Sequence, residues 1–196
     1  WDQRLCLVPD GDLFRALRKG TASIVTDHIE HFTEQGIQLK SGAALDADIV
    51  VSATGLELLI LGGIQLTVDS QPVKIADSLV YKGMMFSGIP NLALAAGYTN
   101  ASWTLKCDLT SQYVCRLLAY MDKHNYKYCM ATNSDPSVQR TQFLDLASGY
   151  IDRAVDQFPK QGNKAPWRLY QNYLLDIITL RVRSLRDRAL TFYKTE

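Results

Sequence analysis

A wide apolar stripe in the second half of the chain constrains the fold more than any other feature. Its members recur at intervals of four, which places them on one face of a helix: Leu105, Leu109, Tyr113, Leu117 and Met121. An apolar run at 92–96 ends in Gly97 shortly before this helix. A buried strand that turns through glycine into a long helix indicates α/β layers rather than a helical bundle or a β-sandwich.

The remaining patterns are shorter and mostly of the strand type. A short helix is predicted at 12–17, ended by Gly20, and helical segments around 150–157 and 170–180. Strands are predicted at 24–25, 29–32, 37–39, 49–51, 64–68 and 73–75. The β-branched run 49–51 is typical of a strand that is covered on both faces. We therefore expect an α/β fold with a β-meander, a strand–turn–helix unit and a helical C-terminal region.

Composition excludes several classes of protein. Apolar residues make up 47% and charged residues 21%, which are values of a globular chain and not of a disordered one. The net charge is +1, so charge alone predicts neither a nucleic-acid nor a membrane partner. The basic end of the chain is interpreted as a solvated helical face (Arg181, Arg183, Arg186 and Arg188). No apolar run approaches the roughly 18 residues that a membrane helix needs.

The four cysteines suggest reduced thiols and a cytoplasmic location. Cys107 and Cys115 are eight residues apart in the predicted helix, hence about 12 Å along its axis. A disulfide needs Cα atoms within roughly 7 Å, so these two cannot bridge. His28 and His31 point to opposite faces of a strand, and no cysteine lies near them in sequence, so no metal site is expected.

The turn after residue 96 is the most informative place for chemistry. Gly97 lets backbone approach a ligand closely, and the unpaired N–H groups at the start of the following helix favour a phosphate, a carboxylate or an electron-rich carbonyl. Asn100 or Ser102 can serve as the N-cap. A purely structural turn fits these residues equally well, and both interpretations stay open.

Motifs of other chemistries are missing from the sequence. It contains no G-x-G-x-x-G and no G-x-x-x-x-G-K-[ST], the two glycine-rich phosphate-binding patterns. It also has no convincing Ser/His/Asp or Cys/His set for nucleophilic catalysis.

Three segments together resemble one family. They read ADIVVSATGLEL, YKGMMFSGIPNLALAAGYTNASWTLKCDLTSQYVCRLL and PKQGNKAPWRLYQNYLLD. They are similar to the C-terminal part of flavin-containing Baeyer–Villiger monooxygenases, and among these to the ethionamide-activating type. The resemblance covers practically the whole chain and implies a fragment of a longer enzyme with two dinucleotide-binding domains.

The resemblance also implies domains and cofactors. Residues 1–53 are expected to be the last part of an NADPH-binding domain, and 54–196 the C-terminal part of an FAD-binding domain with a helical tail. The parent enzyme would use NADPH to reduce FAD and would insert oxygen from O₂, through a C4a-peroxyflavin, into a ketone or onto sulfur. The fragment itself is expected to retain neither FAD nor NADPH and to be inactive.

Site residues follow from the same resemblance. The expected FAD contacts are Gly55, Gly97, Asn100, Ser102, Trp103 and Thr104. Arg4 matches a family arginine that stabilises negative charge beside the flavin, although a plain surface arginine is the alternative. Lys82, Gly83 and Met84 are expected near the cofactor, whereas packing is favoured for Met84 and Met85, and also for Trp167 and Tyr173.

Two alternatives concern the partners of the chain. The expected partners are a small carbonyl or sulfide substrate and O₂, with dimerisation of the fragment through apolar faces left exposed. The rival hypothesis is a stand-alone binding or assembly module without catalysis.

Overall fold

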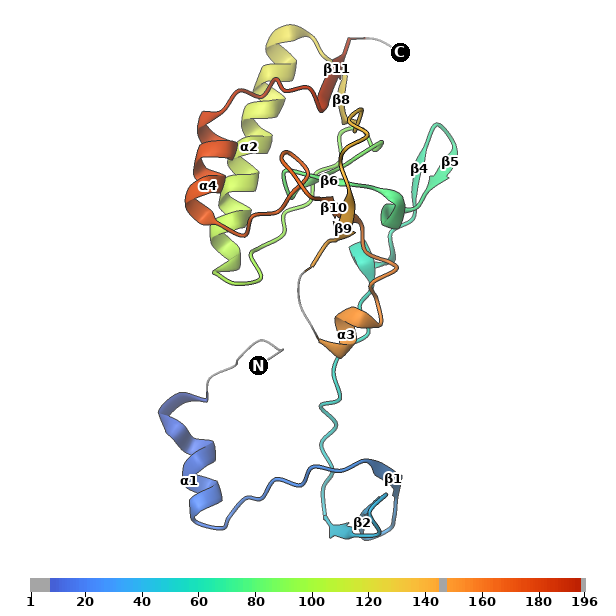
Figure 1. Ribbon diagram of the computed structural model, residues 1–196, viewed down its shortest axis with the longest axis vertical. Coiled ribbons are helices and arrows are strands. Elements are labelled where there is room, and N and C mark those ends of the chain that lie inside the picture. The colour runs from blue at the N-terminus through green and yellow to red at the C-terminus, as the bar shows by residue number, and fades with distance from the viewer. Residues whose placement is uncertain (1–7, 145–147, 195–196) are drawn as a thin grey trace. The chain divides into compact units, whose positions relative to one another are not determined.

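The computed structural model describes residues 8–144 and 148–194, and the chain forms two compact units (Figure 1). The N-terminal unit ends at Leu56 and the C-terminal unit begins at Glu57. This boundary lies three residues beyond the one predicted at 53/54. The assignment of the two parts to NADPH- and FAD-binding domains stays a prediction.

The N-terminal unit holds a short helix and a three-stranded meander. A 3₁₀ turn, η1 (Pro9–Gly11), leads into α1 (Asp12–Arg18), and the strands are β1 (Ile29–Phe32), β2 (Gly36–Leu39) and β3 (Ala44–Asp46). They pair antiparallel in the order β1-β2-β3. The predicted helix at 12–17 and the strands at 29–32 and 37–39 are thereby confirmed.

Gly36 is required where β2 meets β3. A Cβ at this position would lie 2.0 Å from the carbonyl oxygen of Leu45, a distance that no side chain can occupy. The backbone there also has φ +154°. Close approach of the two strands therefore depends on glycine.

Two strands predicted in the N-terminal unit do not form. Residues 24–25 and 49–51 lie in irregular backbone, and Ile49 and Val51 are 82% and 83% exposed. β-Branched residues favour extended backbone, but a ladder also needs a neighbouring strand to pair with. The described part of this unit supplies no such neighbour to 49–51, so the prediction of a strand covered on both faces is wrong for this chain.

The C-terminal unit combines one long helix with small antiparallel sheets. Its paired strands are β4 (Leu66–Val68) with β5 (Gln71–Val73), β6 (Val80–Tyr81) with β7 (Met85–Phe86), β9 (Arg140–Gln142) with β10 (Lys160–Gly162), and β8 (Tyr128–Ala131) with β11 (Leu190–Tyr193). Its helical elements are η2 (Ile60–Gly63), η3 (Ile75–Asp77), α2 (Trp103–His124), α3 (Gly149–Asp152), α4 (Tyr173–Ile177) and the π-helical turn η4 (Ile178–Val182).

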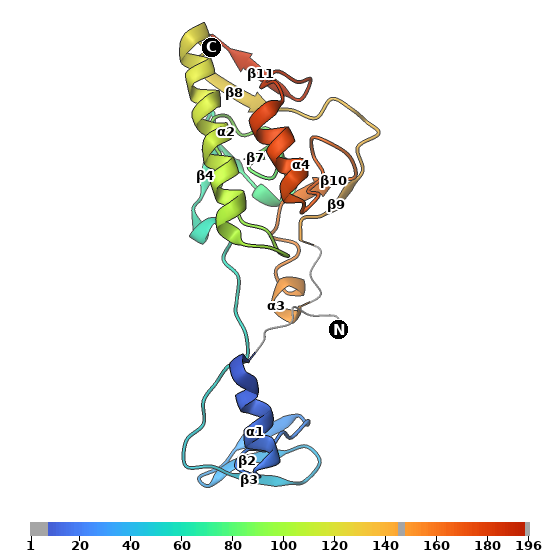
Figure 2. The same ribbon diagram turned by 90° about the vertical axis from the view of Figure 1, so that its left-hand side faces the viewer.

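Helix α2 follows the predicted stripe. Leu109, Tyr113, Leu117 and Met121 are buried, whereas Leu105 at the helix start is exposed. The helix ends at Asn125, which adopts the left-handed conformation that asparagine tolerates at a C-cap. Helix α4 and η4 lie alongside α2 (Figure 2), so the chain returns to this helix near its C-terminal end.

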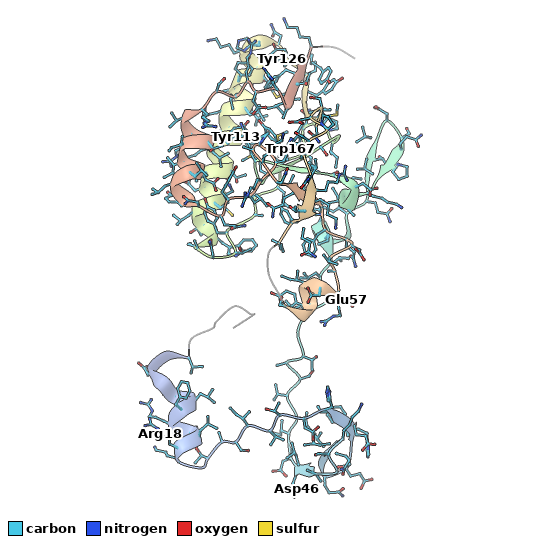
Figure 3. All side chains as sticks on the ribbon, in the orientation of Figure 1. Arg18, Asp46, Glu57, Tyr113, Tyr126 and Trp167 are labelled. Carbon is cyan, nitrogen blue, oxygen red and sulfur yellow. The ribbon has the colours of Figure 1, made fainter. Side chains whose placement is uncertain are left out.

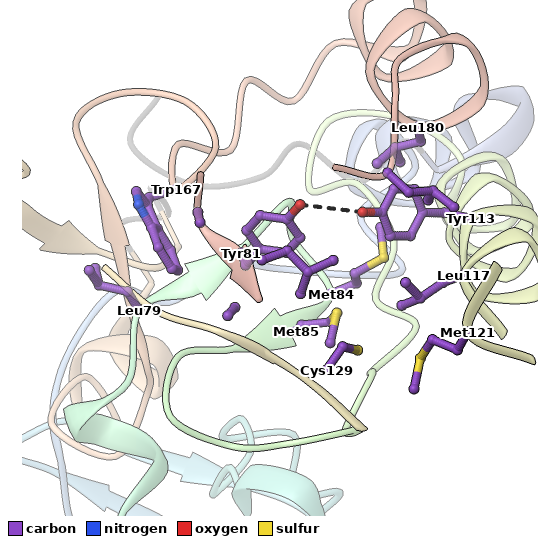
Figure 4. Close-up of a cluster of buried hydrophobic side chains, with 14 of the residues drawn as sticks. Leu79, Tyr81, Met84, Met85, Tyr113, Leu117, Met121, Cys129, Trp167 and Leu180 are labelled. Atoms are coloured by element: carbon purple, nitrogen blue, oxygen red, sulfur yellow. Dashed lines mark hydrogen bonds between the residues drawn. The ribbon is translucent and has the colours of Figure 1, made fainter. Parts of the chain in front are cut away.

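The core of the C-terminal unit lies between α2 and the small sheets. Side chains crowd around Tyr113 and Trp167 (Figure 3), and Figure 4 shows Tyr81 and Met84 between them. The Tyr81 and Trp167 rings meet edge to face at 5.8 Å between centroids. Tyr81, Leu109 and Tyr113 are fully buried. Apolar burial and aromatic packing thus connect segments about 90 residues apart in sequence.

The expected α/β layering is partly wrong. The fold does mix helices and strands, but residues 92–96 form no ladder beyond an isolated antiparallel bridge from Ala93 to Met85, and 93–95 are exposed. Each ladder of the described chain runs antiparallel, and parallel pairing is limited to the isolated bridges Leu79–Lys160 and Ser87–Ala131, so the layers of a parallel sheet are not seen there. Of the helical segments predicted near the C-terminus, the one at 150–157 is shorter, at Gly149–Asp152, whereas the one at 170–180 is confirmed by α4 and η4, which together run from 173 to 182.

Candidate functional site

The start of α2 and the loop before it bring five predicted residues together. Gly97, Asn100, Ser102, Trp103 and Thr104 lie within eight positions, on the loop and the first turn. A Cβ at Gly97 would come within 2.3–2.5 Å of the Trp103 ring and its Cα. Glycine is therefore needed there so that the Trp103 indole can fold back against the loop.

The first turn of α2 is open to an electron-rich partner. Ser102 is the N-cap residue, yet its side chain does not cap the helix, and its Oγ pairs instead with the Thr104 Oγ1 at 2.8 Å. The first turn carries no acidic side chain, and residues 101–105 are exposed. The first N–H groups and the positive end of the helix dipole are therefore available to an acceptor atom.

A segment near the C-terminus fixes this loop in place. The Thr99 N–H donates to Oε1 of Gln171 at 3.1 Å, and the Asn100 side chain donates to the Gln171 carbonyl at 3.2 Å. The Tyr98 hydroxyl donates to Oδ2 of Asp176 in α4 at 2.6 Å. Three consecutive residues of the loop are thus held by residues more than 70 positions away.

A buried ion pair reinforces the same junction. Nζ of Lys106 lies 2.8 Å from Oδ2 of Asp176, and the two side chains are 7% and 13% exposed. The ammonium also sits 5.6 Å from the centre of the Tyr98 ring. Burial is the main cause, and the hydrogen bond to Asp176 the second, of a pKa of Tyr98 above its usual range. The hydroxyl therefore keeps its proton and stays a donor.

A second buried lysine, Lys82, also pairs with an aspartate and lies near tyrosine hydroxyls. Nζ of Lys82 lies 3.0 Å from Oδ2 of Asp187, which also accepts from the Tyr81 hydroxyl at 2.6 Å. The Tyr113 hydroxyl lies 3.3 Å from that of Tyr81. Burial, with Tyr113 and Asp187 adding to it, raises the pKa of Tyr81 far above its usual range. Lys82 therefore has a carboxylate partner that is itself partly exposed.

The other predicted residues are placed as follows. Met84, Met85 and Trp167 are buried in the core, and Tyr173 packs against it, so packing is confirmed as their role. Gly55 has φ +102° in the N-terminal unit, a conformation that favours glycine. Arg4 lies outside the described residues. The structure therefore gathers the residues of 97–104, and the roles of these residues, of Gly55 and of Arg4 at the flavin stay predictions.

Three contributors to this site escaped the sequence analysis: Lys106, Gln171 and Asp176. Lys106 had a visible signal, because it falls on the same face of the predicted helix as Leu109 and Tyr113. A lysine inside an apolar stripe needs a buried counter-charge. Nothing local in the sequence marks Gln171 or Asp176 as that partner.

The described residues offer neither a metal site nor a membrane-spanning helix. Residues 8–144 and 148–194 contain no group of three or more His, Cys, Asp or Glu side chains that could hold a metal ion. Within the same ranges, none of the helices is long and apolar enough to cross a membrane.

Comparison with known proteins gives strong matches along nearly the whole chain. The chain is 53% identical over 194 residues to the FAD-containing monooxygenase EthA of Mycobacterium tuberculosis, a match that covers 99% of this chain. The chain is related to FAD-containing monooxygenases. It is also 47% identical to EthA of Mycolicibacterium smegmatis and 54% identical to AlmA of Acinetobacter baylyi, named a "Probable FAD-binding monooxygenase".

The matches cover part of each relative. The chain spans about two fifths of the length of the curated relatives, 40% of EthA from M. tuberculosis and 39% of AlmA. No family model and no solved structure matches the chain. The predicted resemblance is confirmed at the level of an FAD-containing monooxygenase.

Proposed function

We propose that the chain is the C-terminal part of an FAD- and NADPH-dependent monooxygenase that transfers oxygen from O₂ to a small ketone or sulfide. The observation that carries this proposal is the 53% identity over 99% of the chain to an FAD-containing monooxygenase. On this proposal, residues 1–53 belong to the NADPH-binding domain and 54–196 to the FAD-binding domain.

The start of α2 fits the edge of a flavin ring. Its exposed first turn offers backbone N–H groups, and no carboxylate of that turn competes for them. When bound, the flavin supplies the oxygen chemistry, which protein side chains cannot provide. The N–H groups of 103 and 104 would donate to a flavin oxygen, and the helix dipole would stabilise negative charge there.

The surrounding residues hold the donor groups in position. Gln171 and Asp176 bind the loop at Tyr98, Thr99 and Asn100, so the N–H groups are fixed before a ligand arrives. Preorganised donors stabilise developing charge without reorganising at the moment of reaction. On the family resemblance alone, Gly55 is proposed as an FAD contact and Arg4 as the catalytic arginine that stabilises negative charge beside the flavin.

The first experiment compares the complete polypeptide that contains this sequence with the 196-residue chain alone. The complete protein is expected to carry flavin absorbance and to oxidise NADPH in a manner that depends on O₂ and a ketone or sulfide. The chain alone is expected to be colourless and inactive. A flavin-free complete protein would contradict the monooxygenase proposal and favour the binding or assembly module.

A second experiment tests the position of the flavin. Thr104→Asp in the complete protein places a carboxylate in the exposed first turn of α2, and we expect a lower flavin reduction potential and weaker FAD retention. Ser111→Asp adds the same charge at an exposed position two turns further along, as a control. Equal effects of both substitutions would contradict a flavin at the helix start.

A further inference from the structure

A cavity of about 730 Å³ in the C-terminal unit has no lining residue from 97–104. It is lined by three loops, 132–138, 165–167 and 183–189, and by Lys82. Its volume is in the range that small-molecule sites occupy, roughly 300–1,000 Å³. Its lining combines apolar side chains, among them Val138, Pro166 and Trp167, with charged ones.

The two carboxylates that line the cavity are already satisfied. Asp187 accepts from the Tyr81 hydroxyl, Lys82 Nζ and two backbone N–H groups, at 2.6–3.1 Å. Asp135 pairs with Lys164 at 2.6 Å and accepts from the Ser137 side chain and N–H. Lys164 and Ser137 hold the pKa of Asp135 well below its usual range. Both carboxylates are therefore neutralised by protein groups.

The arginines of the third loop are not neutralised in this way. Arg183 and Arg188 line the cavity, and neither has a carboxylate within ion-pair distance among the described residues. Arg186 donates to the Tyr120 hydroxyl at 2.5 Å, a neutral partner. The arginines of this loop thus bring positive charge to the cavity wall, and no acidic side chain among the described residues pairs with Arg183 or Arg188.

We propose that this cavity binds a small organic phosphate. A guanidinium group donates two parallel hydrogen bonds to a phosphate, and several arginines around one cavity suit a dianion better than a single carboxylate. Thr132, Ser134 and Ser184 add hydroxyl donors at its wall. The apolar lining residues Val138, Pro166 and Trp167 accommodate the organic part of the ligand. None of the flavin-contact residues proposed at 97–104 lines this cavity.

The test is calorimetric titration of the full 196-residue chain with phenyl phosphate. We expect saturable binding, with Arg183→Gln/Arg188→Gln weakening it at least about tenfold, since each lost hydrogen bond to a charged group removes substantial affinity. Lys74→Gln/Lys123→Gln removes the same charge from exposed positions outside the cavity and is expected to change the affinity less than about twofold.

Three other ligands decide the chemical class. Inorganic phosphate is expected to bind more weakly than phenyl phosphate because it lacks the apolar part, and benzoate and phenol more weakly still. Absence of phenyl phosphate binding, equal affinity for benzoate, or equal loss in both double variants would overturn the proposal.

A measurement on the unaltered chain removes any dependence on how the variants fold. Phenyl phosphate is expected to shift the side-chain Nε–Hε NMR signals of Arg183, Arg186 and Arg188. Arg140, which donates to the Asp77 carbonyl and does not line the cavity, is expected to remain unshifted. Shifts spread evenly over all arginines would show unspecific binding and overturn the proposal.

Discussion

The two units of this chain differ in how they cover their apolar side chains. In the C-terminal unit, Tyr81, Leu109 and Tyr113 are fully buried. In the described part of the N-terminal unit, Gly36 and Leu39 are the only buried residues, and Phe32 and Val51 are 64% and 83% exposed. A segment of strand-forming composition therefore stays irregular where this chain brings no partner to it, as at 49–51.

The largest difference between the units is expected on truncation of apolar side chains. Leu109→Ala should lower the free energy of unfolding of the C-terminal unit by about 4 kcal/mol, because it leaves a cavity in a packed core. Val51→Ala should change stability by less than about 0.5 kcal/mol. Urea unfolding followed by circular dichroism measures both. A comparable cost at Val51 would show that 49–51 is packed after all.

The next largest effect is expected at the buried ion pair. Lys106→Met keeps much of the side-chain volume but leaves Asp176 buried without its counter-charge, and should cost about 3 kcal/mol. Lys164→Met breaks a pair whose side chains are 42% and 49% exposed, so its cost should stay below about 1 kcal/mol. The same unfolding experiment compares them. Equal costs would mean that burial does not separate these pairs.

A smaller effect is expected at the glycine beside Trp103. Gly97→Ala should destabilise the C-terminal unit by about 2 kcal/mol, because its Cβ would overlap the indole ring. Adding Trp103→Ala should recover part of the loss, since the contact with the Trp103 Cα remains. Gly149→Ala, where the new Cβ meets Arg153 at 3.4 Å, serves as the control and should be near neutral. Without partial recovery in the double variant, the ring is not the obstacle.

The smallest effect is a pH dependence from Cys129. Burial raises the pKa of this thiol from 9.0 to about 11. Its contribution to stability is therefore complete below pH 9 and is lost as pH rises toward 11. Between pH 8 and pH 10 the chain should lose about 1 kcal/mol more stability than Cys129→Ala. The exposed Cys115 gives the control, and Cys115→Ala should follow the unaltered chain.

The sequence predicted what depends on neighbouring residues. The spacing of apolar residues at intervals of four predicted α2. Gly20 marked the end of α1 and Gly36 the start of β2, both of which the structure confirms. The pairing of β8 with β11 was missed because its strands are about 60 residues apart, and short strands of this kind carry no distinctive periodicity. The strand predicted at 92–96 failed because an apolar run shows the tendency to extend without showing which strand will pair with it.

At the candidate site, too, the sequence predicted the contiguous residues and missed those that come from a distant segment. The residues of 97–104 were predicted from a glycine turn before a helix and from the family resemblance, and their contact with FAD stays a prediction. Gln171 and Asp176 were missed because their role exists only after α4 has packed beside α2. Lys106 was detectable as a charge in an apolar stripe, but its partner was not.

The two buried lysines have a consequence for synthesis of the chain. Lys82 and Lys106 leave the ribosome long before Asp176 and Asp187, their partners. Until those aspartates are translated, burial of either ammonium would be opposed by an uncompensated charge. A product that stops before these aspartates lacks the counter-charges of both ammonium groups, so closure of this core is tied to synthesis of the segment that carries Asp176 and Asp187.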